Sequence, residues 1–161
     1  MKKKEEKTEK QEALNAFKNA SEMDFDEKIR KDAWLNYAKL SYEVGNPYQS
    51  VPEVLSTYIK AYPDAPENEE LESLLIDSYI TSKNYKEALT LLEDKKGFDY
   101  KVAYQKVAFY RAIELFNEGL YSEAKEHFEK SLSEPRTPSF VARAQFWKAE
   151  CDYLLDNYQQ A

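Results

Sequence analysis

A short motif recurs along the chain at nearly constant spacing. Its clearest copies are Tyr85-Lys86-Glu87-Ala88, Tyr121-Ser122-Glu123-Ala124 and Tyr158-Gln159-Gln160-Ala161. Looser copies end at Val51 and Ala13, so that the spacings from Ala13 to Ala161 are 38, 37, 36 and 37 residues. A large apolar residue lies four positions after each of the first four copies: Phe17, Leu55, Leu92 and Phe128. Since a period of roughly 20–50 residues is typical of stacked supersecondary units, the spacing predicts a repeat array.

Glycine and proline divide the chain into stretches rich in Ala, Leu, Glu and Lys, which are good helix formers. Each of Gly45, Gly97 and Gly119 follows such a stretch, where glycine ends a helix at little cost. Ser50 and Glu53 match a capping box, which would place Pro52 in the first turn of a helix. The alternation typical of strands is absent. We therefore expect an all-α protein with helices at roughly 8–22, 26–44, 50–62, 67–82, 84–96, 99–118, 121–133 and 138–155.

Composition excludes several other classes of protein. The formal net charge of −7 disfavours nucleic acid as a partner, because nucleic-acid binders usually carry a basic surface. No run approaches the roughly 18 apolar residues of a membrane helix, so we expect no membrane insertion. A single cysteine, Cys151, excludes an internal disulfide, and a single histidine, His127, removes most histidine-based metal and triad chemistry. We expect no cofactor, no metal site and no catalytic residue.

One segment combines several features of a known repeat. Trp34, Tyr37 and Ala38 lie on one expected helix, Val51 lies on the next, and Pro63 follows twelve residues after Val51. This order resembles the tetratricopeptide repeat family, whose pattern is Trp-x-x-Leu-Gly-x-x-Tyr, then Ala-x-x-x-Phe, then Pro. Later copies carry Ala112 and Ala149 at the small position that lets paired helices approach, whereas the second copy has Ile76 there. The resemblance covers about residues 8–161 and implies a right-handed α-solenoid of antiparallel helix hairpins.

On that resemblance, residues 1–161 form one solenoid segment. A half repeat covers 8–22, and the following units cover 26–64, 67–97, 99–135 and, truncated, 138–161. The incomplete units at both ends lead us to expect a segment of a longer array, whose exposed ends self-associate. Long repeats, many tyrosines and an acidic surface are similar to bacterial cell-envelope tetratricopeptide proteins of the Tol–Pal coordinator type. That similarity implies a periplasmic location and a signal peptide in the parent protein, while the residues themselves leave a cytoplasmic location open.

Members of this family bind a partner peptide or protein along a concave groove lined by the first helix of each hairpin. The family register places these residues in the groove: Leu35, Lys39, Tyr42, Ser73, Asp77, Ile80, Phe109, Ile113, Phe116, Phe146, Glu150 and Tyr153. Exposed aromatic rings there would anchor apolar side chains of a partner. The alternative is that several of these residues only pack between repeats. A clamp for a C-terminal carboxylate is disfavoured, because positive charge at the equivalent positions comes only from Lys106 and Arg143.

We therefore expect a non-catalytic scaffold for protein–protein interaction. The alternative within the structural class is a spacer segment that holds other repeats apart without a ligand of its own. An enzyme is disfavoured, because His127 has no second histidine or cysteine nearby in the sequence and Cys151 lies among acidic residues, which disfavour a thiolate.

Overall fold

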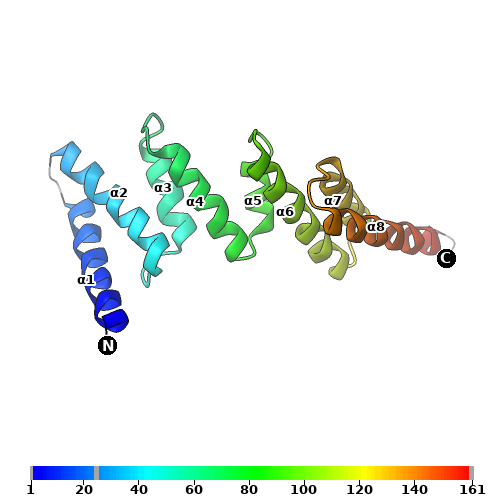
Figure 1. Ribbon diagram of the computed structural model, residues 1–161, viewed down its shortest axis with the longest axis horizontal. Helices are drawn as coiled ribbons and strands as arrows, with labels where there is room; N and C mark the ends of the chain where they lie inside the picture. The colour runs from blue at the N-terminus through cyan, green and yellow to red at the C-terminus, as the bar shows by residue number, and fades with distance from the viewer. Residues whose placement is uncertain (1, 24–25, 160–161) are drawn as a thin grey trace. The chain divides into compact units, whose positions relative to one another are not determined.

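The computed structural model describes residues 2–23 and 26–159, with side chains for 3–23 and 26–156. Over these residues the regular elements are all helices (Figure 1): α1 (Lys2–Glu22), α2 (Glu27–Val44), α3 (Val51–Ala61), α4 (Asn68–Thr81), α5 (Tyr85–Leu92), α6 (Phe98–Asn117), α7 (Tyr121–Ser133) and α8 (Pro138–Gln159). The all-α prediction is confirmed for this part of the chain. The chain divides into two compact units, residues 1–78 and residues 79–161, and the division falls within α4.

Most helix boundaries agree with the prediction to within two residues, and three differ. Helix α1 begins at Lys2 because its Lys- and Glu-rich start forms helical pairs such as Glu6–Lys10, whose charged atoms are 3.2 Å apart. Helix α5 ends at Leu92, the last buried residue before the polar segment 93–97. Gly97 therefore precedes α6, with φ +124°, and does not terminate α5.

Helix α8 continues to Gln159, without the break that the fifth motif copy predicted near residue 156. One repeat earlier, Gly119 adopts φ +78° and turns the chain between α6 and α7. Asp156 occupies the corresponding position in α8, where a side chain makes that conformation costly. The final residues of this motif copy, Gln160 and Ala161, lie outside the described residues.

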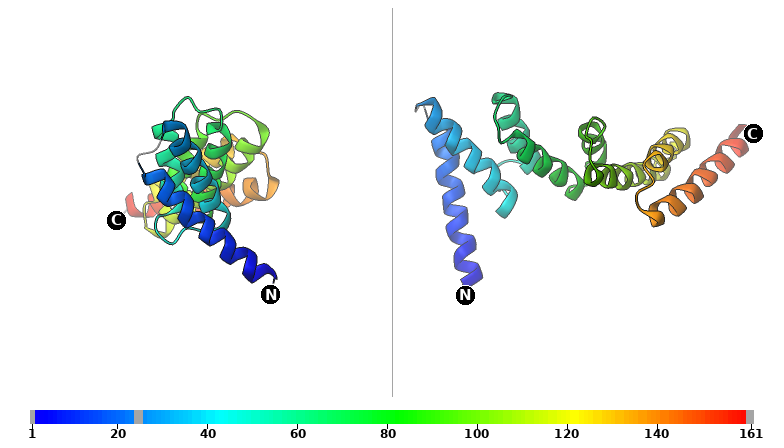
Figure 2. Two further views of the ribbon diagram at one scale, coloured as in Figure 1. Left: turned by 90° about the vertical axis from the view of Figure 1, so that its left-hand side faces the viewer. Right: turned by 45° about the horizontal axis from the view of Figure 1, so that its top comes forward.

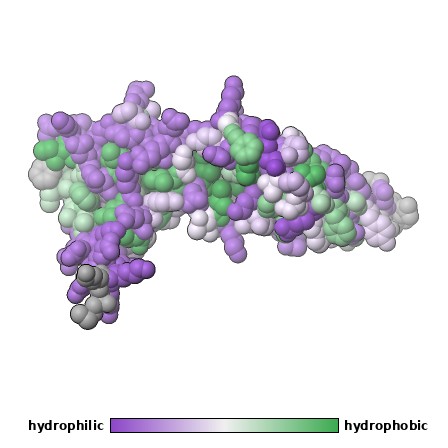
Figure 3. All heavy atoms as spheres, viewed as in Figure 1, coloured by the Kyte–Doolittle hydropathy of each residue, from purple (hydrophilic) through white to green (hydrophobic). Residues whose placement is uncertain are grey.

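In the first unit α2 packs against both α1 and α3, and α1 and α2 run antiparallel (Figures 1 and 2). Ser50 caps α3 by accepting a hydrogen bond from the Glu53 amide at 3.4 Å, as the capping pattern predicted. The buried hydrophobic residues come from all four helices of this unit: Leu14, Ala33, Tyr37, Ala38, Val54, Leu55, Tyr58, Leu71, Leu75 and Ile76. On the face seen in Figure 3, hydrophilic residues cover most of α1.

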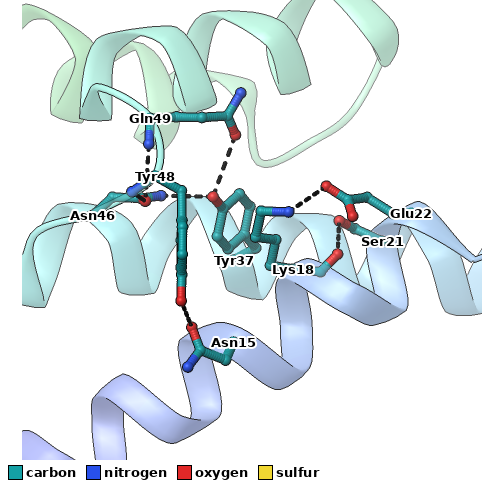
Figure 4. Close-up of polar contacts among 8 residues, drawn as sticks. All are labelled: Asn15, Lys18, Ser21, Glu22, Tyr37, Asn46, Tyr48 and Gln49. Atoms are coloured by element: carbon teal, nitrogen blue, oxygen red, sulfur yellow. Dashed lines mark hydrogen bonds and ion pairs between the residues drawn. The ribbon is translucent and has the colours of Figure 1, made fainter.

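The turn between α2 and α3 is held by a polar network that also includes α1 (Figure 4). The Asn46 side-chain oxygen accepts hydrogen bonds from the Tyr48 and Gln49 amides, and its nitrogen donates to the Tyr37 hydroxyl at 2.7 Å. The Tyr48 hydroxyl donates to Asn15 of α1 at 2.7 Å, and the Lys18 ammonium lies 5.6 Å from the centre of the Tyr48 ring. These contacts give the exposed ring of Tyr48 a structural role in fixing α1 to the turn.

In the second unit α6 packs against α5, α7 and α8, and α7 packs against α8. A cluster of buried residues joins the last three helices: Phe109, Ala112, Leu115, Ala124, Phe128, Ala144 and Cys151. Ion pairs Lys125–Asp152 and Lys148–Glu129, at 2.5 and 3.1 Å, connect α7 to α8 at the rim of this core. The small positions Ala88, Ala112 and Ala124 are fully buried, whereas Ala149 is exposed.

Candidate functional site

In the first unit, three of the predicted groove residues, Lys39, Tyr42 and Asp77, form polar contacts between helices. The Lys39 ammonium lies 2.7 Å from a Glu70 carboxylate oxygen, and the Tyr42 hydroxyl donates to Asp77 at 2.6 Å. Both contacts join α2 to α4. The hydrogen bond to Asp77 raises the pKa of Tyr42 above its ordinary value. Leu35 is half-buried, and the Ser73 hydroxyl donates to the Glu69 carbonyl one turn earlier.

A group of three aromatic rings packs in the interior of the first unit. The Tyr58 ring is fully buried and lies 6.1 Å from Trp34 and 5.0 Å from Tyr62, measured between ring centres. Burial and the nearby Glu67 carboxylate raise the pKa of Tyr58 to about 12. Trp34 itself is half-buried and contacts Tyr58 edge-on, so these rings stabilise the junction of α2 and α3 and are packing residues.

Phe109 of α6 does not lie on an accessible surface, which corrects its assignment to the groove. Its ring is fully buried, 5.7 Å from Phe128 of α7 and 5.2 Å from Phe140 of α8. The Arg143 guanidinium covers the ring at 4.6 Å from its centre. Arg143 is thereby engaged in a cation–π contact, while Lys106 is exposed.

Aromatic rings of the second unit reach the surface along α8. Phe116 lies 5.2 Å from Tyr121 and 5.0 Å from Trp147, and Trp147 lies 5.3 Å from Phe146. Phe146 is 58% exposed and Tyr153 is 65% exposed, although both are large apolar side chains. We call the set Phe116, Phe146, Trp147, Glu150 and Tyr153 the aromatic surface.

The remaining predicted groove residues contribute less. Ile113 is half-buried and packs against the buried cluster of α6, α7 and α8. Ile80, near the end of α4, is also half-buried, and Glu150 is half-buried on α8. Trp147 contacts both Phe116 and Phe146, and the spacing of Phe146, Glu150 and Tyr153 places these three on one side of α8. Trp147 was not among the predicted groove residues.

A shallow hollow of about 420 Å³ lies at the α6–α7 turn. Gly119, Leu120 and Tyr121 line it from the turn, and Leu155 lines it from α8. Tyr121 also contacts Phe116, so the hollow adjoins the aromatic surface. Leu120 is 44% exposed and gives the hollow an apolar edge.

Groups that could carry chemistry are placed elsewhere. The Nδ1 atom of His127 lies 2.9 Å from the Glu123 carbonyl oxygen one turn earlier on α7. Cys151 is fully buried, and burial together with Asp152 raises the pKa of its thiol. Among the described residues, no group of three or more His, Cys, Asp or Glu side chains is arranged to hold a metal ion.

Comparison of the chain with protein-family models, with curated proteins and with solved structures finds no match. In the part of the chain that the structure describes, no helix has both the length and the apolar character needed to cross a bilayer.

Proposed function

We propose that this chain is a non-catalytic protein-interaction scaffold of the tetratricopeptide type, in which helix hairpins stack as a right-handed solenoid. Its aromatic surface on α8 would bind an apolar segment of a partner protein. The observation that carries this proposal is the exposure of Phe146 and Tyr153 on one side of α8, next to the partly buried rings of Trp147 and Phe116.

Leaving such rings in water is costly. Burying a large side chain contributes about 1.5–3 kcal/mol, and aromatic residues commonly dominate the energy of protein interfaces. Phe146 and Tyr153 lie seven residues apart, so they share one side of the helix at a spacing of two turns. A partner with two apolar side chains about 10 Å apart along its length would cover both rings. The hollow beside Tyr121 offers room for a third apolar group.

A spacer without a ligand is the second candidate, and the first unit favours it. Lys39, Tyr42 and Asp77 are already engaged in contacts between α2 and α4. Groove residues that stabilise the array in this way are not free to bind a partner. The two candidate functions therefore make different predictions for α8: a scaffold binds a partner there, and a spacer does not.

A random-peptide phage library panned on the purified chain separates them. We expect enrichment of peptides with aromatic or aliphatic anchors, whose affinity falls about tenfold or more in the double variant Phe146→Ala, Tyr153→Ala. Phe98→Ala is the matched control, because Phe98 is 67% exposed and lies outside the aromatic surface. A library that yields no enriched peptide, or peptides that bind the double variant equally well, would favour the spacer.

A further inference from the structure

Helices α6 and α7 pack against each other through a buried interface. The Phe109 and Phe128 rings lie 5.7 Å apart, and the Ser131 hydroxyl donates to the Gln105 carbonyl at 2.8 Å. The α6 residues of this interface are Gln105, Phe109, Ala112 and Phe116, and the α7 residues are Ala124, Phe128 and Ser131. Six of these seven residues are fully buried, and Phe116 is half-buried.

The equivalent of the α6 face is open on α8. Thirty-seven residues after the α6 residues come Ala142, Phe146, Ala149 and Tyr153. All four are exposed, and their spacing of four, three and four residues places them on one side of the helix. We call them the open α8 face.

The equivalent of the α7 face is open on α1. Ala13, Phe17 and Ala20 each lie 111 residues before their counterparts Ala124, Phe128 and Ser131. They are half-buried, whereas the counterparts are fully buried. We call Ala13, Phe17 and Ala20 the open α1 face.

Ile29 of α2 extends this equivalence. It lies 111 residues before Phe140, the α8 residue whose ring covers Phe109 at 5.2 Å. Ile29 is 54% exposed although it is a large apolar residue. The pair α1–α2 thus presents outward the same kind of residues that α7–α8 present to α6.

We propose that the open α8 face of one copy of this chain binds the open α1 face of a second copy, with Ile29 of the second copy covering Phe146. The contact reproduces between two molecules the interface that α6 forms with α7 and α8 within the second unit. It joins two different surfaces, so a dimer keeps one open α1 face and one open α8 face free, and the association continues head to tail.

Lysines of α1 come close to the C-terminal end of α8 in this arrangement. Helices α6 and α7 are joined by a short turn and run antiparallel, so the C-terminal end of α8 would lie beside the N-terminal end of α1. The last turns of α8 carry the exposed Asp156 together with Glu150, and the first turns of α1 carry exposed Lys3, Lys4 and Lys7 among exposed Glu5, Glu6 and Glu9. Cations beside the C-terminus of a helix are favoured by its dipole.

The open α8 face and the aromatic surface share Phe146 and Tyr153, but Ala149 belongs only to the former and Glu150 only to the latter. Ala149 lies on the same side of α8 as Phe146 and Tyr153, since successive helical residues are rotated by about 100°. Substitution of Ala13, which lies on α1 outside the aromatic surface, therefore tests self-association separately from peptide binding.

The test is sedimentation velocity of the chain from about 10 µM to 1 mM. We expect the average mass to rise above 18.9 kDa with concentration. Ala149→Glu and Ala13→Glu should each raise the dissociation constant about tenfold or more, while the exposed control Phe98→Glu should leave it unchanged. Far-UV circular dichroism and a thermal melt establish that each variant is folded.

Mixing the two variants decides between head-to-tail and symmetric contacts. Ala149→Glu retains the open α1 face and Ala13→Glu retains the open α8 face, so an equimolar mixture should form a dimer of about 38 kDa and stop there. Association that Ala13→Glu does not weaken would indicate a symmetric α8–α8 contact and overturn the proposal. A wild-type chain that stays monomeric at every concentration would also overturn it and leave the α8 face to another occupant.

Discussion

The fully buried side chain of Gln105 is bonded at both ends of its amide. Its oxygen accepts a hydrogen bond from the Thr137 amide at 2.7 Å, and its nitrogen donates to the Thr137 carbonyl at 3.2 Å. Thr137 directly precedes α8, so this pair fixes the start of α8 against α6. A buried amide costs little when its polar atoms are paired in this way.

The buried thiol of Cys151 should react slowly in the folded chain. Because the thiol is fully buried and its pKa is raised, we expect a thiol-specific reagent to label the native chain far more slowly than the urea-unfolded chain. The measurement is the labelling rate followed by mass spectrometry. Ala149→Cys in a Cys151→Ser background supplies an exposed thiol on the same helix as the control. Equal rates for Cys151 in the native and unfolded chains would place it at the surface.

Among the predicted site residues, what sequence reasoning missed was the environment of single side chains. The family register placed Phe109 and Phe146 at equivalent positions, yet one is fully buried and the other is 58% exposed. The difference comes from Phe140 and Arg143, which cover Phe109 from α8. A periodic pattern identifies the side of a helix but does not show whether a neighbouring helix covers it.

At the scale of the element, helix positions followed from residue types that act locally. Ser50 and Pro52 placed the start of α3, and Gly45 with φ +80° ended α2. The predicted ends of α5 and α8 were wrong because no residue near the observed ends gives a strong signal for ending a helix. Segment 93–97 has helix-forming lysines but nothing to bury, and Asp156 replaces the glycine that would have turned the chain.

The turn from α7 to α8 carries a pH-dependent ion pair. The Glu134 carboxylate lies 3.0 Å from the Lys101 ammonium of α6, and this hydrogen bond is the largest cause of the lowered pKa of Glu134. A lowered native pKa contributes stability above the unfolded value, and that contribution is lost as the pH falls through the native value. Arg136 lowers the pKa of Glu134 further, but less strongly.

We therefore expect the second unit to lose stability on acidification below about pH 4.5, and Lys101→Met to reduce the dependence. The measurement is the urea midpoint of the chain between about pH 6 and pH 3, compared for wild type, Lys101→Met and Arg136→Met. Arg136→Met should have the smaller effect. Parallel pH profiles for wild type and Lys101→Met would mean that the pair contributes nothing to stability.

At the scale of the whole molecule, the repeat predicted the helices but not the division into two units. The division falls within α4, inside the expected repeat 67–97. A sequence period reports which residues are equivalent, and it does not report how closely successive hairpins pack. The second copy also departs from the pattern, with the buried Ile76 at the position where other copies carry alanine.

The central claim is that the small, fully buried side chain of Ala124 lets the paired helices α6 and α7 approach closely. The test is to replace two alanines by phenylalanine, one at a time. Ala124 is fully buried between helices, and Ala149 is exposed. In urea unfolding of the dilute chain, Ala124→Phe should lower the free energy of unfolding by about 1–3 kcal/mol through overpacking. Ala149→Phe should change it by less than about 0.5 kcal/mol, as is usual at exposed sites. Equal effects at the two positions, or no loss at Ala124, would contradict the claim.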